Sequence, residues 1–218
     1  MKAIILMGAP GAGKGTVAER IRECSPFVHV STGDMLRTAV KEGTEIGRKA
    51  EQFMQRGELV PDDVMARVIE GRLGQGGNST SYMFDGFPRT ESQAMLLEKT
   101  LSKIGGSVNR VYYLEASREV LLARLTGRRV CRSCGANYHV INIPPQQDGV
   151  CDTCGGGLYH RPDDREKTIA NRLDVFERQT EKLISHYEDR GLLKRVDSDV
   201  AVDALVNEIM RDLGMGGS

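Results

Sequence analysis

The sequence lacks an excess of charge of either sign, and it lacks any long apolar run. Its 218 residues include 30 acidic and 30 basic side chains, so the net charge at pH 7 is zero and nothing indicates a general polyanion-binding protein. No apolar run approaches the roughly 20 residues that a helix needs to cross a bilayer. The N-terminus, from Met1 to Ile4, leads directly into a predicted strand and has the features of neither a signal peptide nor a transit peptide. We therefore expect a cytoplasmic protein without a membrane partner, built as one domain with insertions.

Cysteine is scarce and unevenly placed. In a chain expected in the cytosol, the five cysteines do not indicate disulfides. Four of them form the pairs Cys131-x-x-Cys134 and Cys151-x-x-Cys154, separated by sixteen residues, which is the spacing of a four-thiolate zinc site. The remaining Cys24, near a predicted helix end, is interpreted as a small buried apolar residue.

The predicted zinc site has two interpretations. It could belong to a nucleic-acid-binding ribbon, or it could be a structural site that stabilises this segment. No lysine or arginine lies between Gly135 and Cys154, whereas binding to a phosphate backbone needs clustered basic residues. Four thiolates leave no open coordination position, which argues against a catalytic metal. Segments below about 40 residues rarely build their own core without a metal or disulfides. We therefore favour a structural zinc site and expect no nucleic-acid partner.

A glycine-rich segment, Gly8 to Thr16, lies between an apolar run and a stretch with helical spacing. Gly8, Gly13 and Lys14 match the phosphate-binding pattern G-x-x-x-x-G-K. Backbone N–H groups in such a loop surround a phosphate, the lysine reaches the terminal phosphates, and a following hydroxyl ligates Mg²⁺. Position 15 is glycine where the general pattern has Ser or Thr, and Thr16 supplies the hydroxyl one residue later. The alternative is a tight strand–helix connection with no ligand.

Short apolar runs alternate with segments of helical spacing along most of the chain. Strands are predicted at Lys2–Met7, Val28–Val30, Tyr82–Asp85, Arg110–Glu115 and Leu193–Val196. Thr90 and Ser117 are predicted helix caps, Thr90 with Gln93 as a capping box, and one long helix is predicted from about Asp164 to Arg190. This alternation predicts an α/β fold, a five-stranded parallel sheet with helices on both faces. Residues 31–60 and 127–164 interrupt it and are predicted to be inserts on the rim of the sheet.

Polar residues follow two of the predicted strands. Asp85 ends one strand, where a carboxylate would lie near the phosphate loop and could hold Mg²⁺ directly or through water; a turn or helix-cap role is the alternative. Thr32 is predicted to cap the next helix, with Arg37 about one turn further on. Arg89 follows the turn after Asp85. Because both arginines come from loops after strand ends, we expect them to converge at one sheet edge.

A basic cluster surrounds the cysteine insert. Phosphoryl transfer between two polyphosphates needs several guanidinium groups to offset anion repulsion, and this cluster could provide them. Salt bridges to Asp163, Asp164 and Glu166 are the alternative, and the functional interpretation is stronger for Arg128, Arg161 and Arg172 than for the rest. The cluster comprises Arg124, Arg128, Arg129, Arg161, Arg165 and Arg172.

Over essentially its whole length, the chain resembles the adenylate kinases, in their long-lid, zinc-bearing bacterial form. The residues that carry the resemblance are Gly8–Thr16, Ser31–Arg37, Asp85–Thr90, Gly127–Arg129 and Arg161–Asp164. The Gly15-Thr16 ending of the phosphate loop is the ending this family uses. The resemblance implies a three-layer α/β/α P-loop fold and reversible transfer of the γ-phosphoryl group of MgATP to AMP, giving two ADP. It also implies a structural Zn²⁺ at the four cysteines and a monomeric enzyme.

The resemblance implies site residues position by position. The implied ATP site comprises Gly11, Ala12, Gly13, Lys14, Gly15 and Thr16 around the phosphates, Arg124 against the base, Arg128, Asn137, Tyr138 and the main chain of Val200. The implied AMP site comprises Thr32, Arg37, Glu58, Leu59, Val60, Gly86, Phe87, Pro88, Arg89, Gln93, Arg161 and Arg172. The implied catalytic set is Lys14, Asp85, Arg89, Arg128, Arg161 and Arg172, and the implied metal ligands are Cys131, Cys134, Cys151 and Cys154.

The family's organisation divides the chain into three parts. The core is expected at residues 1–30, 61–126 and 165–218, a nucleoside-monophosphate-binding insert at 31–60, and a zinc-binding lid at 127–164. Both inserts are expected to close over the substrates, since an open site would let water accept the phosphoryl group. Catalysis is expected to rest on alignment and charge stabilisation without a general base, because the AMP phosphate is already a nucleophile.

Three alternatives remain open at this stage. The first is a sister kinase that phosphorylates UMP or CMP, or uses GTP as donor; such pyrimidine kinases usually have alanine where Thr32 stands, whereas Gln93 suits the edge of adenine. The second is a nucleotide-switched zinc-ribbon protein that binds nucleic acid, which the lack of basic residues between the cysteine pairs disfavours. The third is a structural protein with a relic nucleotide site, which leaves the arginines unexplained.

Overall fold

The core of the molecule is a five-stranded parallel sheet in the order β2-β3-β1-β4-β8. The computed structural model describes residues 2–75 and 80–215, so positions 1, 76–79 and 216–218 of the predicted core lie outside it. All five predicted strands are confirmed, and β4 begins three residues earlier than expected. Their bounds are Lys2–Met7 (β1), Val28–Ser31 (β2), Tyr82–Asp85 (β3), Ser107–Glu115 (β4) and Leu193–Asp197 (β8).

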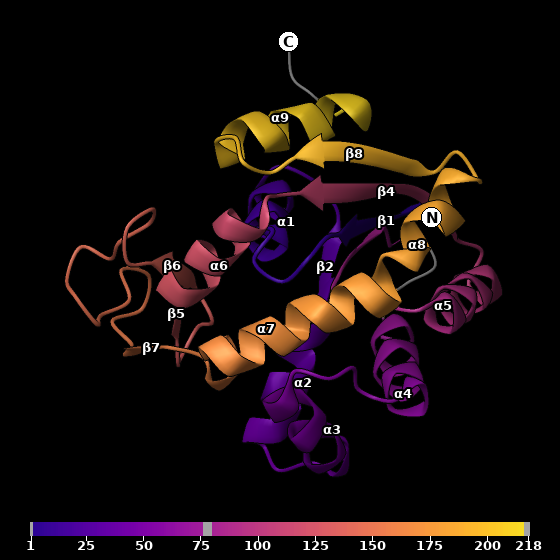
Figure 1. Ribbon diagram of the computed structural model, residues 1–218. Helices are drawn as coiled ribbons and strands as arrows, with labels where there is room; N and C mark the ends of the chain where they lie inside the picture. The colour runs from indigo at the N-terminus through magenta and orange to yellow at the C-terminus, as the bar shows by residue number, and fades with distance from the viewer. Residues whose placement is uncertain (1, 76–79, 216–218) are drawn as a thin grey trace.

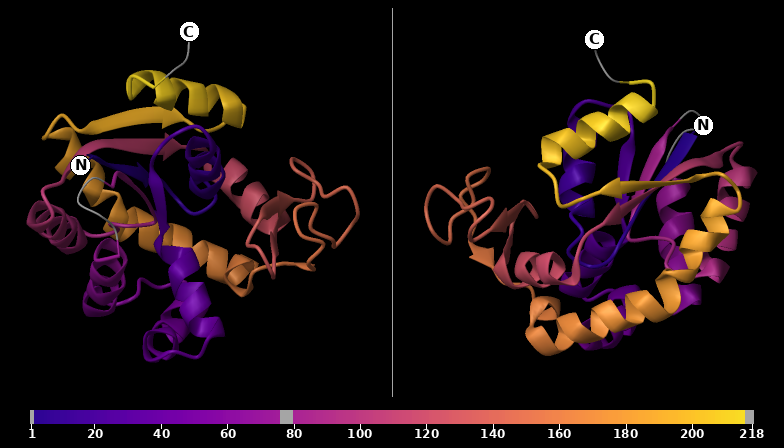
Figure 2. Two further views of the ribbon diagram at one scale, coloured as in Figure 1. Left: turned by 180° about the vertical axis from the view of Figure 1, so that it is seen from behind. Right: turned by 45° about the horizontal axis from the view of Figure 1, so that its top comes forward.

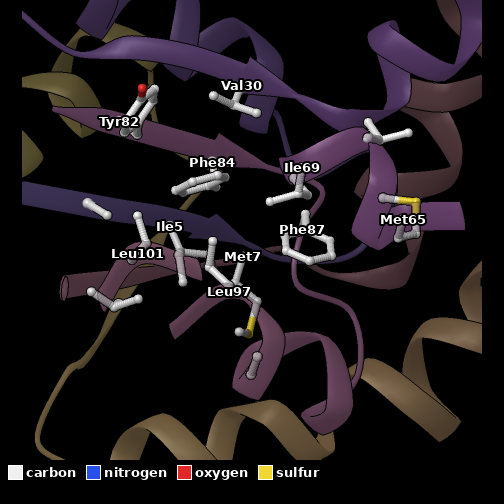
Figure 3. Close-up of a cluster of buried hydrophobic side chains, with 14 of the residues drawn as sticks. Ile5, Met7, Val30, Met65, Ile69, Tyr82, Phe84, Phe87, Leu97 and Leu101 are labelled. Carbon is white, nitrogen blue, oxygen red and sulfur yellow. The ribbon is translucent and has the colours of Figure 1, made fainter. Parts of the chain in front are cut away.

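The central strand β1 is buried on both faces, which explains why it reads as a continuous apolar run. Because side chains alternate along a strand, Ile5 and Met7 enter one core cluster while Ile4 and Leu6 enter the other. Figure 3 shows the first cluster, in which Ile5 and Met7 lie close to Phe84 and Leu97. Helices therefore cover both faces, as the sequence predicts (Figure 1).

Helices fill the connections between the strands. They are α1 (Lys14–Glu23), α4 (Asp62–Leu73), α5 (Glu91–Lys103), α6 (Arg118–Gly127), α7 (Glu166–Val175), α8 (Lys182–Glu188) and α9 (Val202–Asp212). The predicted caps are present: the Thr90 hydroxyl accepts the Gln93 N–H at 3.2 Å, and the Ser117 hydroxyl accepts the Val120 N–H at 3.4 Å. No helix in the described ranges is long and apolar enough to cross a membrane.

The long helix expected from about Asp164 to Arg190 is present as one helical segment, but it is not a regular α-helix throughout. A π-helical turn, η2 (Phe176–Thr180), separates α7 from α8, with the Glu181 N–H donating to the Phe176 carbonyl. The wide turn marks a change of packing partner. Leu173 before it packs in one core cluster, whereas Leu183 after it packs in the other. The two halves of the segment thus contribute to different core clusters, which a single apolar stripe does not reveal.

Two regions project from this core (Figure 2). The first contains α2 (Thr32–Lys41) and α3 (Glu45–Arg56). The second begins after α6 with a small antiparallel sheet in the order β6-β5-β7, formed by β5 (Arg128–Cys131), β6 (Asn137–His139) and β7 (Leu158–Tyr159). A short 3₁₀ turn, η1 (Pro162–Asp164), leads from it into α7. These regions coincide with the two interruptions seen in the sequence.

Gly47 lets α2 and α3 approach closely. A Cβ built there would lie 2.0 Å from the Ala39 carbonyl oxygen, which is backbone and cannot move aside cheaply. We expect Gly47→Ala to destabilise the α2–α3 region by about 1–3 kcal/mol, the usual range for overpacking. In contrast, Gly71 lies within α4 with no heavy atom near its built Cβ, so Gly71→Ala should stabilise the chain by about 0.5–1 kcal/mol. Chemical denaturation of both variants measures their free energies of unfolding. Equal changes in the two variants would contradict the close packing at Gly47.

Candidate functional site

The glycine-rich loop connects β1 to α1 at the carboxyl edge of the sheet. Gly8, Gly11 and Gly13 all have positive φ angles, and a Cβ on Gly8 would lie 2.7 Å from the Leu114 carbonyl oxygen. Gly13 is the N-cap of α1, and within the described residues no side chain caps that end. Its first-turn N–H groups are therefore available to an anion, in the field of the helix dipole. Because β1 lies between β3 and β4, the loop is also at the topological switch point of the sheet, where ligands bind.

Lys14 is folded back over this loop. Its Nζ donates to the carbonyl oxygens of Gly8 and Ala9, each at 2.9 Å. Burial lowers the pKa of Lys14 to about 8, although the nearby Asp85 carboxylate opposes that change. The side chain is thus mostly protonated at neutral pH and sits where terminal phosphates would approach the loop.

Asp85, at the end of β3, lies beside the same loop. A Cβ on Gly15 would be 3.7 Å from Asp85 Oδ2, and His29 Nε2 lies 3.6 Å from that oxygen. Burial by itself would raise the pKa of Asp85, but the His29 and Lys14 side chains bring it below its ordinary value. Asp85 and Thr16 line the same cavity, and a carboxylate with a hydroxyl is a suitable donor set for Mg²⁺.

Residues after β2 and β3 meet on the other side of the loop. The Thr32 hydroxyl donates to the Gly86 carbonyl at 3.0 Å, and Arg89 Nε donates to the same oxygen at 2.8 Å. The prediction that Thr32 caps the helix is wrong. Ser31 caps α2 by accepting the Asp34 N–H, because Thr32 is the first helical residue and its hydroxyl is turned toward β3.

Gln93 departs from the predicted capping box. Its Oε1 accepts the Arg89 N–H at 2.9 Å instead of returning to the cap, and its Nε2 donates to Asp62 at 2.7 Å. The amide is thereby fixed in orientation while one donor hydrogen and one acceptor lone pair remain for a ligand. Asp62 is a positioning residue that the sequence analysis missed, because its partner lies thirty-one positions away.

The arginine cluster is built around acidic side chains, of which Asp164 is buried. Arg128 donates to both oxygens of Asp164, at 2.7 and 2.5 Å, and Arg172 donates to Asp164 at 2.8 Å. Arg161 lies 3.6 Å from Asp34, which also pairs with Arg37. The salt bridges considered as an alternative to function therefore exist for Arg128 and Arg172, which pair with Asp163 or Asp164. Both arginines nevertheless line one cavity, together with Arg161.

Two of the six basic residues stand apart from that cavity. Arg129 donates to the carbonyls of Thr126 and Arg128 and is absent from the described cavity walls, and Arg165 is exposed. Asp34 lies within the Ser31–Arg37 segment, and its role is not evident from the sequence. Burial would raise its pKa, but Arg37 and its other partners lower it to about 2, so it is a permanent anion between two arginines.

These groups line two adjoining cavities of about 540 and 70 Å³. The large one contains the phosphate loop, Asp85, Arg124, Asn137, Tyr138 and Val200, while the small one contains Thr32, Glu58, Val60 and Gln93. Leu59, Arg37, Arg89 and Arg172 line both. Of the predicted nucleotide-site residues, only Phe87 is missing from the described cavity walls. It is 1% exposed and packs in the core (Figure 3), because the Gly86 turn directs its ring inward.

The far end of the large cavity is formed by α6 and the segment after β8. Arg124 donates to the Ser198 carbonyl at 2.6 Å, which fixes the guanidinium beside Asp199 and Val200. Ser198 was not singled out from the sequence. The only signal in the sequence was its position two residues before Val200, which is a predicted ATP-site residue.

The four cysteines come together as their spacing predicts. Their sulfurs all lie within 4.8 Å of one another, and the Cys131–Cys154 and Cys134–Cys151 pairs are 3.5 Å apart. Tetrahedral zinc with bonds of about 2.3 Å would place sulfurs about 3.8 Å apart, so the cluster fits this metal. The isolated Cys24 is exposed, which corrects the prediction that it is buried; it ends α1 where the helix meets solvent.

Comparison with known proteins agrees with this geometry. The sequence pattern described as "Adenylate kinase" matches residues 6–192. A protein named adenylate kinase from Geobacillus sp. (strain WCH70) is 45% identical over 211 residues, covering 97% of this chain and 98% of the relative. Its counterpart from Syntrophobacter fumaroxidans is 48% identical over 211 residues, covering 97% and 99%. A nucleotide-sized cavity at the phosphate loop, the converging arginines and this similarity lead to one conclusion: the chain belongs to the adenylate kinase family.

Proposed function

We propose that the two adjoining cavities hold ATP and AMP end to end, with their phosphates meeting at Arg89 and Arg172. As a member of the family, the enzyme converts ATP and AMP to two ADP. The observation that carries the proposal is that Arg37, Arg89 and Arg172 line both cavities, so cationic groups are concentrated where they join. Two polyanions brought end to end need positive charge at that point.

ATP would occupy the large cavity. The loop from Gly11 to Thr16 would surround its phosphates, Lys14 would bind the terminal ones, and the adenine would lie toward Arg124 and Val200. Asn137 and Tyr138 would cover it from β6. When MgATP is bound, Mg²⁺ neutralises charge on the β- and γ-phosphate oxygens, and Thr16 with Asp85 would hold it.

AMP would occupy the small cavity. The amide of Gln93 would face the edge of the base, and Glu58, Leu59 and Val60 would supply main-chain contacts. Arg37 and Arg89 would bind the AMP phosphate. The fixed Gln93 amide presents the donor and acceptor that an adenine edge requires. Comparison of AMP with UMP and CMP as acceptors tests the open alternative of a pyrimidine kinase.

The transfer itself would need alignment and charge, without a general base. An oxygen of the AMP phosphate forms a bond to the γ-phosphorus of ATP while the bond to the β–γ bridging oxygen breaks, leaving ADP on both sides. Arg128, Arg161 and Arg172 would stabilise the charge on the transferring group, and the buried Asp164 would hold two of them in place.

Two contacts support a closing role for the projecting regions, which we assign as an AMP-binding insert (31–60) and a lid (127–164) on a core of residues 1–30, 61–126 and 165–218. Arg161 of the second lies 3.6 Å from Asp34 of the first, and Lys41 Nζ donates to the Arg132 carbonyl at 3.5 Å. The two regions thus touch across the cavities. Such closure would exclude water from the transferring phosphoryl group.

A coupled assay for ADP formation from ATP, AMP and Mg²⁺ tests the proposal. We expect AMP to be the preferred acceptor over GMP, UMP and CMP at equal concentration. A preference for UMP or CMP would contradict the assignment of the small cavity, and retained nucleotide binding without ADP formation would contradict the transfer role.

We further propose that the four cysteines bind one Zn²⁺ ion that stabilises the lid. Stripping the metal with a chelator is expected to lower the melting temperature, because the lid has only a small core, formed by Cys131, Tyr138 and Cys151 with two partly buried neighbours. Re-addition of Zn²⁺ should restore it. As a matched pair, Cys154→Ser should melt like the stripped protein and Cys24→Ser like the loaded one. Identical melting with and without metal would contradict the role.

A further inference from the structure

Tyr138 touches the four-cysteine site with its hydroxyl group. The side chain lies on β6 and is only 7% exposed. Its oxygen accepts the Asp152 N–H at 2.8 Å and lies 3.4 Å from Cys151 Sγ. Because the oxygen already accepts a hydrogen bond from Asp152, its own hydrogen is free to be donated to the sulfur. A metal-bound cysteine is a thiolate, and a thiolate accepts such a hydrogen bond.

Tyr138 also forms part of the wall of the large cavity. Its neighbours on β6, Asn137 and His139, line the same cavity, as does Arg128, which pairs with His139 across the small sheet. The metal site and the nucleotide cavity therefore share one short strand. Tyr138 is the residue of that strand that reaches both.

We propose that Tyr138 is a positioning residue through which Zn²⁺ at the four cysteines and ATP in the large cavity strengthen each other's binding. Groups that hydrogen-bond to metal ligands orient those ligands and typically change metal affinity by about 10–100-fold. Because Tyr138 contacts Cys151 and also lines the cavity, zinc that fixes Tyr138 would fix part of the ATP-binding wall. Coupling between two sites is reciprocal, so ATP would then raise the zinc affinity by the same factor. This inference rests on the proposed metal site and ATP site, and it adds a link between them.

The test is a thermodynamic cycle on Tyr138→Phe, which removes the hydroxyl and keeps the ring. Calorimetry with a non-hydrolysable ATP analogue and Mg²⁺ is run on zinc-loaded and stripped protein, and zinc affinity is measured by competition with a chromophoric chelator. In the unmodified chain, stripping should weaken analogue binding by about 5-fold or more. In Tyr138→Phe, stripping should change analogue binding little, and zinc affinity should fall by about 10-fold. AMP binding should be unchanged by the substitution.

Tyr159→Phe is the matched control. Tyr159 lies on β7 in the same small sheet, packs against the Arg132 guanidinium and is outside the described cavity walls. This variant should match the unmodified chain in zinc affinity and in binding of the ATP analogue, both with zinc loaded and with zinc removed. If Tyr138→Phe and Tyr159→Phe give the same zinc affinity and the same analogue binding, the link through Tyr138 is wrong while the metal site stands. If the unmodified chain binds no zinc, the metal site and this inference both fail.

A measurement on the unmodified, zinc-loaded chain covers the case in which Tyr138→Phe does not fold. The Asp152 amide hydrogen is bonded to the Tyr138 oxygen, so its exchange with solvent reports on that contact. We expect the ATP analogue to slow this exchange and AMP to leave it unaffected. Equal effects of the two nucleotides, or no effect of either, would overturn the inference.

Discussion

Replacing Arg89 by alanine is expected to lower kcat by about 10²–10³-fold, the usual loss when one preorganised donor to a developing charge is removed. The side chain is held by the Gly86 carbonyl and lies where the two cavities join. Burial and the neighbouring Arg172 lower its pKa to about 10, so it stays charged at neutral pH. Its Nε is fixed by a backbone oxygen, which leaves the remaining N–H groups for phosphate.

Arg165→Ala is the matched control for this prediction. Arg165 is exposed at the start of α7 and outside the described cavity walls, so its loss should leave kcat and KM near their original values. Melting curves should show that both variants remain folded. An Arg89→Ala enzyme with near-normal kcat would remove Arg89 from the catalytic set.

Replacing Lys14 by methionine should lower kcat/KM for ATP by about 10³-fold, since a charged donor at the terminal phosphates is lost while the apolar stem is kept. The same residue predicts the pH dependence of the unmodified enzyme. The pKa of Lys14 in the free enzyme is about 8, so the ammonium is present below that pH and is lost above it. kcat/KM for ATP should therefore fall as the pH rises through about 8, because this ratio reports groups of the free enzyme.

The measurement is kcat/KM for ATP between neutral and alkaline pH, with Lys49→Met as the control. Lys49 is exposed on α3 and pairs only with Glu45 among the described residues. That variant should keep both the rate and the alkaline decline. A Lys14→Met enzyme that retained the original kcat/KM for ATP, or the decline of this ratio as the pH rises through about 8, would contradict the assigned role.

The central strands β1 and β3 were predictable because each is a short apolar run buried on both faces of the sheet. The phosphate loop was predictable because a positive φ angle at Gly11 and Gly13 requires glycine, and that requirement is visible in a single sequence. The cysteine pairs were predictable because a metal site dictates ligand type and spacing.

The predictions that the structure corrects share a different cause. Phe87 lies within a loop motif, and only the turn at Gly86 decides that its ring enters the core. Ser31 and Thr32 are equally good caps, and the contact of Thr32 with the neighbouring strand selects Ser31. The π-helical turn follows from a change of packing partner along one helix. Each depends on how the segment packs against the rest of the fold, which a local motif does not reveal.

Part of the polar pairing at the site was equally hidden. Asp34 and Asp62 read as surface acids or helix starts in the sequence, whereas Asp164 is already a candidate salt-bridge partner of the arginines. In the fold, they fix Arg37, Gln93 and Arg128 respectively, and these are the residues we expect to touch nucleotides. The sequence thus identified the ligand-binding groups and Asp164, but not the roles of Asp34 and Asp62.

The central claim is that two nucleotides lie end to end across the two cavities. A crystal structure with a bisubstrate mimic, two adenosines joined through a chain of phosphates, tests it most directly. The account predicts one adenosine beside Arg124 and Val200, the other beside Gln93 and Leu59, and the phosphates between Lys14 and Arg89. A structure in which the small cavity stays empty while the second adenosine lies elsewhere would contradict it.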